Sequence, residues 1–240
     1  MKTAVIIQAR LGSTRLPAKV LLPLPTGRTV LEEVIFRCRQ IEGVDVVVVA
    51  LADDAGSNLL LPCVDRAKSL ARPISTEYVS GGVEYTACAA VPSIEIVRGP
   101  EHDVLKRYVI AAEAVDADVI MRVTADCPLI DPDVCAAVLA HFNAGEHVDY
   151  CSNVHPRSFP HGLDCEVFTR AALLRADAAA TSAACREHVT LYMYTSQDFR
   201  RCNYGQGIDQ SKTRWTLDTI EDYVTICNEF DRRSRLDRAA

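Results

Sequence analysis

The sequence predicts an α/β fold, a three-layer sandwich with a mostly parallel sheet. Apolar runs rich in β-branched residues alternate with amphipathic helical stretches along the 240 residues. One such run, VDVVVVAL at residues 44–51, is almost continuously apolar, which is typical of a parallel strand covered by helices on both faces. Hydrophobic residues make up 49% of the chain, enough for one substantial core. We therefore expect a single domain over residues 1–240.

The first expected elements are a strand, a helix and a second strand. Residues 4–7 are apolar and short enough for a buried strand. Thr29 precedes an apolar pattern with helical spacing, and Glu32 follows it by three residues, the arrangement of a capping box. The VDVVVVAL run then provides the second strand.

Residues 53–93 are less regular. They contain several glycines and prolines, which interrupt helices and strands. We expect an irregular insertion here, with one helix at about residues 59–70. Residues 94–97 form the next expected strand.

The second half of the chain has better-marked boundaries. Asp103 is positioned to cap a helix, and the run at residues 118–123 predicts a third long buried strand. Asp131 is expected to cap the following helix. Pro132 then occupies the first helical position, where proline is best tolerated. The remaining expected elements are a strand at 163–168, a helix at 186–194, a short strand at 215–217 and a last helix capped by Thr219.

The charge balance limits the classes of partner. The net charge is −6, whereas proteins that bind nucleic acids or membrane surfaces usually have a basic excess. No stretch approaches the roughly 20 apolar residues of a membrane span. The first residues also lack the apolar core of a signal peptide, so we expect a cytoplasmic protein without nucleic-acid or membrane partners.

The ten cysteines form no recognisable framework. No C-x-x-C pair occurs, and Cys38, Cys135 and Cys227 lie within apolar runs. We interpret the cysteines as buried free thiols of a reducing compartment. His155 and His161 have no second ligand at a convincing zinc spacing.

The loop after the first expected strand, in the stretch IIQARLGSTRLPAK, is locally basic. Arg10, Arg15 and Lys19 fall within ten positions of an otherwise acidic chain. Gly12 would let a ligand approach the backbone, and Ser13 offers further donors, although the stretch is neither a P-loop nor a dinucleotide fingerprint. Charge-assisted hydrogen bonds from these side chains would suit a triphosphate with a divalent metal. The alternative is a solvated loop with incidental arginines.

Two aspartates follow expected strands elsewhere in the chain. Asp126 and Asp218 would lie at the edge of the sheet where α/β folds bind ligands, and carboxylates there are good Mg²⁺ ligands. Asp126 could instead bond its own backbone in a turn before Pro128, and Asp218 could be a helix cap, for which Thr219 competes. If both carboxylates converge on one cation, that cation would lie beside the phosphates.

Several motifs resemble one enzyme family. The stretches IIQARLGSTRLPAK, TADCPLIDPD and RWTLDTIEDY resemble the cytidylyltransferases that activate sugar acids, such as CMP-KDO and CMP-sialic acid synthetases. RGPEHDVLKRY, DYCSN, PHGLDCEVF and REHVT further resemble the branch linked to spore-coat polysaccharide biosynthesis. The resemblance extends over nearly the whole chain except about residues 53–93.

This resemblance implies a nucleotide-diphospho-sugar transferase fold and transfer of CMP from CTP to a sugar acid or related acceptor. It also implies Mg²⁺ as cofactor, pyrophosphate as product and a homodimer. The implied metal ligands are Asp126 and Asp218, which with Arg10, Arg15 and Lys19 form the implied catalytic set. The implied nucleotide-binding residues are Gln8, Ala9, Arg10, Gly12, Ser13, Arg15, Lys19, Arg98, Asp103 and Asp126. The implied acceptor-binding residues are Asp164, Glu166, Arg186, Glu187 and His188.

Two departures from the family pattern stand out. The family loop usually reads R-L-P-G-K, and here Ala18 replaces the glycine, which would be costly if that position needs a positive φ. The segment before Ile94 is also longer than expected, so it could cover the nucleotide, extend a dimer contact or alter the choice of base. In the acceptor region, REHVT could simply be a surface ion-pair helix, and His188 could be a buried, hydrogen-bonded histidine.

Three other functions are compatible with these residues. A glycosyltransferase of the same fold would commonly carry a D-x-D metal pair, whereas this chain has D-C-P after Asp126. A sugar-phosphate nucleotidyltransferase using another nucleotide is closer in class. A non-catalytic nucleotide-binding protein is the third alternative. The sequence leaves the identity of the acceptor open.

Overall fold

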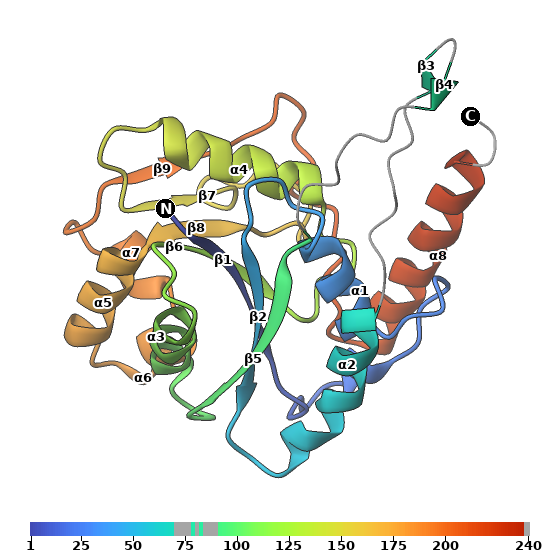
Figure 1. Cartoon of the computed structure of the whole chain (residues 1–240), viewed down its shortest axis with the longest axis horizontal. Coiled ribbons are helices and arrows are strands. Elements are labelled where there is room, and N and C mark those ends of the chain that lie inside the picture. Colours follow the sequence, from blue (N-terminus) through green and yellow to red (C-terminus); the bar gives the residue numbers. More distant parts are fainter. Residues whose placement is uncertain (70–77, 80–81, 84–90, 238–240) are drawn as a thin grey trace.

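The computed structural model describes residues 1–69, 78–79, 82–83 and 91–237, and a seven-stranded sheet runs through its centre (Figure 1). The strand order is β5-β2-β1-β6-β8-β7-β9. The strands are β1 (Thr3–Ala9), β2 (Val46–Ala52), β5 (Ser93–Gly99), β6 (Val119–Thr124), β7 (Tyr150–Ser152), β8 (Glu166–Thr169) and β9 (Arg201–Asn203). A separate antiparallel pair, β3 (Tyr78–Val79) and β4 (Gly82–Val83), lies outside this sheet.

The sheet is mostly parallel, as predicted. β1 pairs in parallel with β2 and β6, so that Ile6 lies between Val48 and Arg122. Only β8, among the strands of this sheet, runs against its neighbours, pairing antiparallel with both β6 and β7. The carboxyl ends of β1, β2, β5, β6 and β7 therefore meet at one edge of the sheet.

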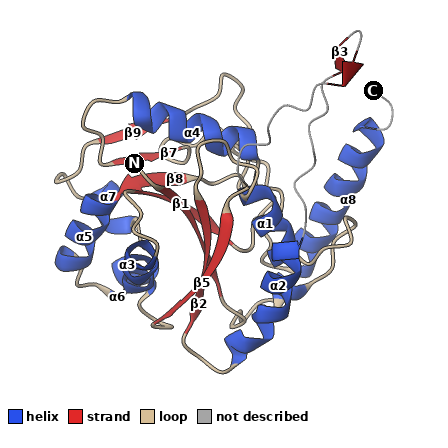
Figure 2. Cartoon of the chain, in the orientation of Figure 1, coloured by secondary structure: helices blue, strands red, loops and turns tan. Residues whose placement is uncertain are grey.

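Helices cover both faces of the sheet (Figure 2). One face packs against α1 (Val30–Cys38), α2 (Leu61–Ser69) and α4 (Pro132–Ala144). The other packs against α3 (Val104–Ala114), α5 (Arg170–Ala179), α6 (Ala183–Glu187) and α7 (Leu191–Thr195). The last helix, α8 (Ile220–Asp237), packs through Ile226 and Phe230 on a third cluster with Leu24 and Leu129. This confirms the predicted three-layer sandwich.

The predicted helix starts are confirmed by their hydrogen bonds. Thr29 Oγ1 accepts from the Glu32 backbone N–H, and Glu32 accepts in return from the Thr29 N–H at 2.7 Å. Asp103 accepts from the Lys106 N–H at 2.9 Å and starts α3. Asp131 caps α4 with proline at the first helical position.

Two expected elements take a different form. The helix expected at 186–194 is divided into α6 and α7, because Val189 between them has a φ of +46°, which no helix accommodates. The strand expected at 215–217 is absent, and the preceding residue, Arg214, makes an isolated bridge with His161. The short strands β7 and β9 were not predicted.

The segment at 53–93 contains more regular structure than expected at its start. A 3₁₀ helix, η2 (Gly56–Leu60), leads directly into α2, close to the helix expected at 59–70. Residues 70–77, 80–81 and 84–90 lie outside the described residues. The single domain with an irregular insertion therefore stays a prediction.

The nine described cysteines are all free thiols. Six of them are buried, including Cys38 and Cys135, whereas Cys227 is only half-buried, so the expected burial is wrong for that residue. Within the described part of the chain, no helix is both long and apolar enough to cross a membrane.

Ala18 adopts the left-handed backbone conformation, with φ +54° and ψ +24°. Its carbonyl accepts from the Leu21 N–H and its N–H donates to the Leu11 carbonyl, so the turn into η1 (Lys19–Leu21) fixes this geometry. The position therefore does require a positive φ, where alanine costs about 1 kcal/mol relative to glycine.

We expect Ala18→Gly to raise the free energy of unfolding by about 0.5–1 kcal/mol, because glycine removes the strain at this backbone conformation. Urea unfolding of the purified protein measures the change. Ala171→Gly, in an exposed first turn of α5, is the matched control and should lower stability instead. Equal destabilisation by both substitutions would contradict this account of Ala18.

Candidate active site

Three segments meet at the carboxyl edge of the sheet. They are the loop after β1, the loop after β6 that carries Asp126, and the segment that leads into α8. The Leu217 backbone joins them, because its N–H donates to the Asp126 carbonyl at 2.9 Å and its carbonyl accepts from Lys19 Nζ at 2.6 Å. Asp218, the next residue, is thereby held beside Asp126.

The Lys19 ammonium lies between the two predicted metal ligands. Its Nζ donates to Asp126 Oδ2 at 2.7 Å and to Asp218 Oδ1 at 2.9 Å. Only 12% of the Lys19 side chain is exposed. Both carboxylates therefore contact one positively charged group, although the cation expected between them was a metal ion and Lys19 was expected to face phosphates.

Asp218 has further cationic neighbours. Arg214 donates to its Oδ2 at 2.5 Å, and Arg15 lies 3.1 Å from its Oδ1. Burial alone would raise the pKa of Asp218, but the hydrogen bond and charge of Lys19, with the two arginines, lower it below its ordinary value. For Lys19, burial opposes the charge, but the two carboxylates outweigh it and raise the pKa. Lys19 and Asp218 are therefore both charged at neutral pH.

Asp218 does not cap α8. The Thr219 hydroxyl accepts from the Asp222 N–H, and the Asp222 carboxylate accepts from the backbone N–H groups of Asp218 and Thr219. The helix start is thus satisfied by Thr219 and Asp222, and the Asp218 carboxylate is left for the cluster.

The two carboxylates fit a divalent cation. Both already bind one cationic group, the Lys19 ammonium, at hydrogen-bond distance. Mg²⁺ is commonly bound by one or two carboxylates together with substrate phosphates and water. Asp126 and Asp218 provide that donor set.

The loop after β1 is open toward this cluster. Nothing lies within 4 Å of the position a Cβ on Gly12 would occupy, and the side chain of Arg15 is 64% exposed. Gln8, at the end of β1, has a buried side-chain oxygen without a hydrogen-bond partner among the described residues. The loop therefore has open space at Gly12 and an exposed cation at Arg15, and the strand before it ends with an unpaired buried acceptor.

Three other predicted residues lie away from Lys19. Arg98 donates to Asn58 at 2.7 Å and to the Ala52 carbonyl, beside η2. Asp103 and Arg186, which we expected in different binding regions, form a two-bond ion pair at 2.6 and 2.9 Å. Asp177 binds the same guanidinium at 2.7 Å, so the structure gives Arg186 a role in joining α3, α5 and α6.

A pocket of about 210 Å³ contains several of the predicted acceptor residues. Asp164, Glu166 and His188 line it. The other polar residues of its wall are Arg122, His155, Arg157, Thr190 and Tyr194. Arg157 binds the Asp164 carboxylate through two bonds, at 2.5 and 2.8 Å. Two guanidinium–carboxylate pairs, from Arg157–Asp164 and Arg122–Glu166, therefore face the same space.

Glu166 is at the centre of a buried network. It accepts from Tyr150 at 2.6 Å and from the Thr190 hydroxyl at 2.7 Å, and it also pairs with Arg122. Burial would lower the pKa of Arg122, but the Glu166 charge outweighs it and raises that pKa. Arg122 Nε, also buried, has no hydrogen-bond partner in the described part of the chain.

The REHVT segment reaches both the loop after β1 and the pocket. Glu187 lies 3.7 Å from Arg10 of the first loop, and both side chains are half exposed. The positive φ of Val189 turns the chain so that His188 and Thr190 reach the pocket. His188 is exposed, so the alternative of a buried histidine is wrong.

The sequence did not point to Arg122, Arg157, Thr190 or Arg214. Arg122 carried a usable signal, because it is the one charged residue inside the apolar run IMRV, and a charge in a buried strand needs a partner. Arg157 and Arg214 lie in irregular segments. Their partners, Asp164 and Asp218, are 7 and 4 residues away in the sequence, and outside a helix this spacing does not predict a contact.

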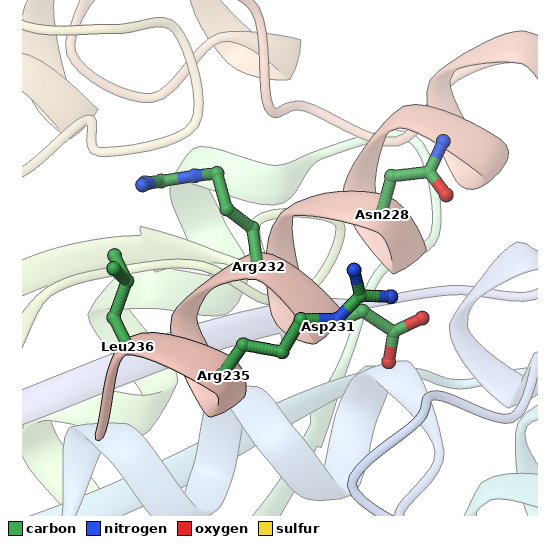
Figure 3. A pocket seen from close by; sticks show the side chains of 5 residues that line it. All are labelled: Asn228, Asp231, Arg232, Arg235 and Leu236. Carbon is green, nitrogen blue, oxygen red and sulfur yellow. The ribbon is translucent and has the colours of Figure 1, made fainter. Parts of the chain in front are cut away.

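A larger hollow of about 430 Å³ lies elsewhere, on the last turns of α8 (Figure 3). Its lining residues, Asn228, Asp231, Arg232, Arg235 and Leu236, all belong to that helix. None of the three segments around Lys19 contributes to it. We therefore assign the candidate active site to the carboxyl edge of the sheet, where Lys19, Asp126 and Asp218 meet.

Comparison with known proteins shows which family and which individual proteins this chain is similar to. A family model described as Cytidylyltransferase matches residues 4–68 and 85–236. The chain is 31% identical over 231 residues to the Spore coat polysaccharide biosynthesis protein SpsF of Bacillus subtilis (strain 168), covering 92% of this chain and 83% of the relative. It is 28% identical over 207 residues to a 3-deoxy-manno-octulosonate cytidylyltransferase of Anaeromyxobacter sp. (strain Fw109-5), covering 81% and 73%.

A solved structure has the same architecture. It is a cytidylyltransferase from Leptospira borgpetersenii serovar Hardjo-bovis (strain JB197), which matches with a TM-score of 0.80 at 30% identity. The match covers 95% of this chain and 85% of that one. The fold predicted from the sequence is confirmed by this likeness.

We expect Lys19→Met to lower the free energy of unfolding by about 2 kcal/mol at neutral pH, because two carboxylates lose their shared hydrogen-bonded cation. The charge of Asp218 contributes stability above its ordinary pKa of 3.8, and that contribution disappears as the pH falls through the lowered folded value. The difference between variant and wild type should therefore shrink in acid. Urea unfolding at about pH 7 and about pH 3 measures it.

Lys68→Met is the matched control, because Lys68 makes only an exposed pair with Asp65 at 3.8 Å. It should change stability by less than about 0.5 kcal/mol at either pH. A Lys19 variant as stable as wild type, or one equally destabilised in acid, would contradict the electrostatic role assigned to Lys19.

Proposed function

Because the chain belongs to the cytidylyltransferase family, we propose that it transfers CMP from CTP to a sugar acid or a related acceptor and releases pyrophosphate. Family membership confirms the resemblance carried by the sequence motifs and makes the protein a nucleotidyltransferase. The names of the two curated relatives support CTP as the nucleotide and polysaccharide biosynthesis as the setting.

One observation carries the proposal. Asp126 and Asp218 converge on the Lys19 ammonium directly beside the open, cationic loop after β1. A polyanion that enters this loop would compete with the carboxylates for Lys19 and Arg15. The cations would move toward the phosphates, and carboxylate oxygens would be released for a metal ion.

The reaction is attack by an acceptor oxygen on the α-phosphorus of CTP. The new oxygen–phosphorus bond forms as the bond to the β-phosphate oxygen breaks, and pyrophosphate leaves. Such chemistry depends mostly on positioning and charge neutralisation. Lys19 and Arg15 would neutralise charge on the departing pyrophosphate, and Arg10 would bind the α-phosphate oxygens.

Asp126 and Asp218 would hold Mg²⁺, which when bound supplies positive charge to the α-phosphate and the incoming oxygen. Gln8 Oε1 would accept a hydrogen bond from the nucleoside, which supports the expected contact of Gln8, Ala9 and Gly12 with the nucleotide. The nucleotide roles expected for Ser13, Arg98 and Asp103 stay part of the proposal. Ser13 Oγ accepts from the Leu16 N–H and so orders the loop.

The acceptor would occupy the pocket between Arg157, Glu166 and His188. Arg122 and Arg157 suit an acceptor carboxylate, and Asp164 and Glu166 suit its hydroxyl groups. Glu187, through its contact with Arg10, lies between this pocket and the phosphate loop. Arg186 would act by positioning α6, since its guanidinium is already bound to Asp103 and Asp177.

A homodimer and a cytoplasmic location complete the proposal. The free state of the nine described cysteines suits a reducing compartment. Ile220 and Val224 lie one turn apart on α8 and are 54% and 53% exposed, which makes this helix the first surface to test for a contact with a second copy.

Pyrophosphate release from CTP in the presence of Mg²⁺ and a panel of sugar acids tests the function directly. Substituting UTP, GTP or ATP separates a cytidylyltransferase from a related enzyme that uses another nucleotide. Release that needs a sugar phosphate in place of a sugar acid would favour the sugar-phosphate class. Nucleotide binding without any release would contradict the proposed reaction.

We expect Asp126→Asn and Asp218→Asn each to lower kcat by about 10²–10³-fold, because each removes a charge contact made in the transition state. Circular dichroism should show both variants folded. Asp133→Asn, an exposed carboxylate in the first turn of α4, is the control and should keep normal turnover. Near-normal turnover in a folded Asp126→Asn variant would remove the metal assignment.

We expect Arg157→Met to raise KM for the acceptor by about 10-fold or more and to leave KM for CTP unchanged, since a charge-assisted hydrogen bond is worth about 1.5–3 kcal/mol. Steady-state kinetics with one substrate saturating measures each constant. Arg175→Met is the control, because Arg175 pairs with Asp149 outside the pocket. A rise in KM for CTP instead would place Arg157 in the nucleotide site.

A further inference from the structure

Three side chains that can bind a transition metal lie together at the β7–β9 edge of the sheet. They are His141, Cys151 and Cys202, and their ligand atoms all lie within 4.8 Å of one another. They come from three different elements, α4, β7 and β9. The proposed reaction uses none of them.

Strand register brings the two thiols together. β7 and β9 pair in parallel with Cys151 directly opposite Cys202. Side chains alternate along a strand, and Cys151 contributes to the core on the α4 face, whereas its neighbour Tyr150 contributes to the core on the opposite face. The sheet therefore separates the two thiols from the Tyr150–Glu166 network of the acceptor pocket.

The third ligand comes from the helix above. His141 lies in the last turn of α4, which packs over β7 and β9 (Figure 1). Its imidazole lies against the Tyr204 ring at 5.8 Å between centroids. It makes no hydrogen bond or ion pair with any described residue, so both ring nitrogens are free to bind a metal.

We propose that His141, Cys151 and Cys202 form a binding site for a divalent metal of the zinc class. Two thiolates and one imidazole are a donor set that Zn²⁺ and Co²⁺ prefer, whereas Mg²⁺ prefers oxygen ligands. Two sulfurs bonded to zinc at about 2.3 Å each lie no more than about 4.6 Å apart, so small side-chain rotations close the site. His141 is exposed and Cys202 half-buried, so water can enter and supply a fourth ligand.

The site would fix the edge of the sheet. β9 is the outermost strand on this side and is only three residues long, so few backbone hydrogen bonds hold it. A metal ion bound by β7, β9 and α4 would join that strand to the helix. Its role is therefore structural and separate from the carboxylate site that we assign to Mg²⁺.

Cobalt titration of the reduced, metal-free full-length protein tests the proposal. We expect one equivalent of Co²⁺ to bind and to produce thiolate-to-cobalt charge-transfer absorption, which Zn²⁺ then displaces. Zn²⁺ should also raise the melting temperature. Cys202→Ser should lose the charge-transfer band, and His141→Ala should weaken binding by about 10-fold or more.

Two controls address the other cysteines and histidines. Cys227→Ser, on α8, and His102→Ala, at an exposed position before α3, should both bind cobalt as the wild type does. The proposal is overturned if no charge-transfer band forms, or if the band persists unchanged in Cys202→Ser and His141→Ala. It is also overturned if Cys151 and Cys202 form a disulfide in air but bind no metal once reduced.

Discussion

The Lys19 ammonium is the contact on which the organisation of the candidate active site depends. It binds two carboxylates and a main-chain carbonyl from segments that are 107 to 199 residues away in the sequence. Two carboxylates this close would otherwise repel each other, and partial burial would strengthen the repulsion. The Lys19 ammonium therefore holds the two carboxylates close together before any ligand arrives.

The other charged side chains around the site are also paired with groups of opposite charge. Asp218 has three cationic neighbours, and the pocket proposed for the acceptor contains two guanidinium–carboxylate pairs. Each pair holds a charged side chain in one position in the free protein. A ligand anion that took the place of Asp164 on Arg157 would leave that carboxylate in need of a new partner, such as a ligand hydroxyl group.

The apolar periodicity and the capping patterns in the sequence were enough to predict the sandwich, its main parallel strands and the capped helix starts. The rule that the carboxyl ends of parallel strands meet at one edge also located Asp126. Asp218 reaches that edge for another reason, because the strand expected at 215–217 is absent and the Leu217 N–H bonds to the Asp126 carbonyl. Contacts between irregular segments could not be predicted from these patterns. The Arg186–Asp103 pair depends on how α6 packs against α3, and the separation of α6 from α7 depends on a positive φ at Val189, which propensity disfavours. Arg157 reaches the pocket from a loop without periodicity.

Gly162 lies at a close contact between two main-chain segments. A Cβ there would lie 2.6 Å from the Trp215 backbone, since the PHGLDC turn and the chain before α8 touch main chain to main chain. The turn that leads to Asp164 and the backbone that leads to Asp218 are thus packed directly against each other. Because this contact joins main chain to main chain, substitutions of the side chains around the pocket leave it unchanged.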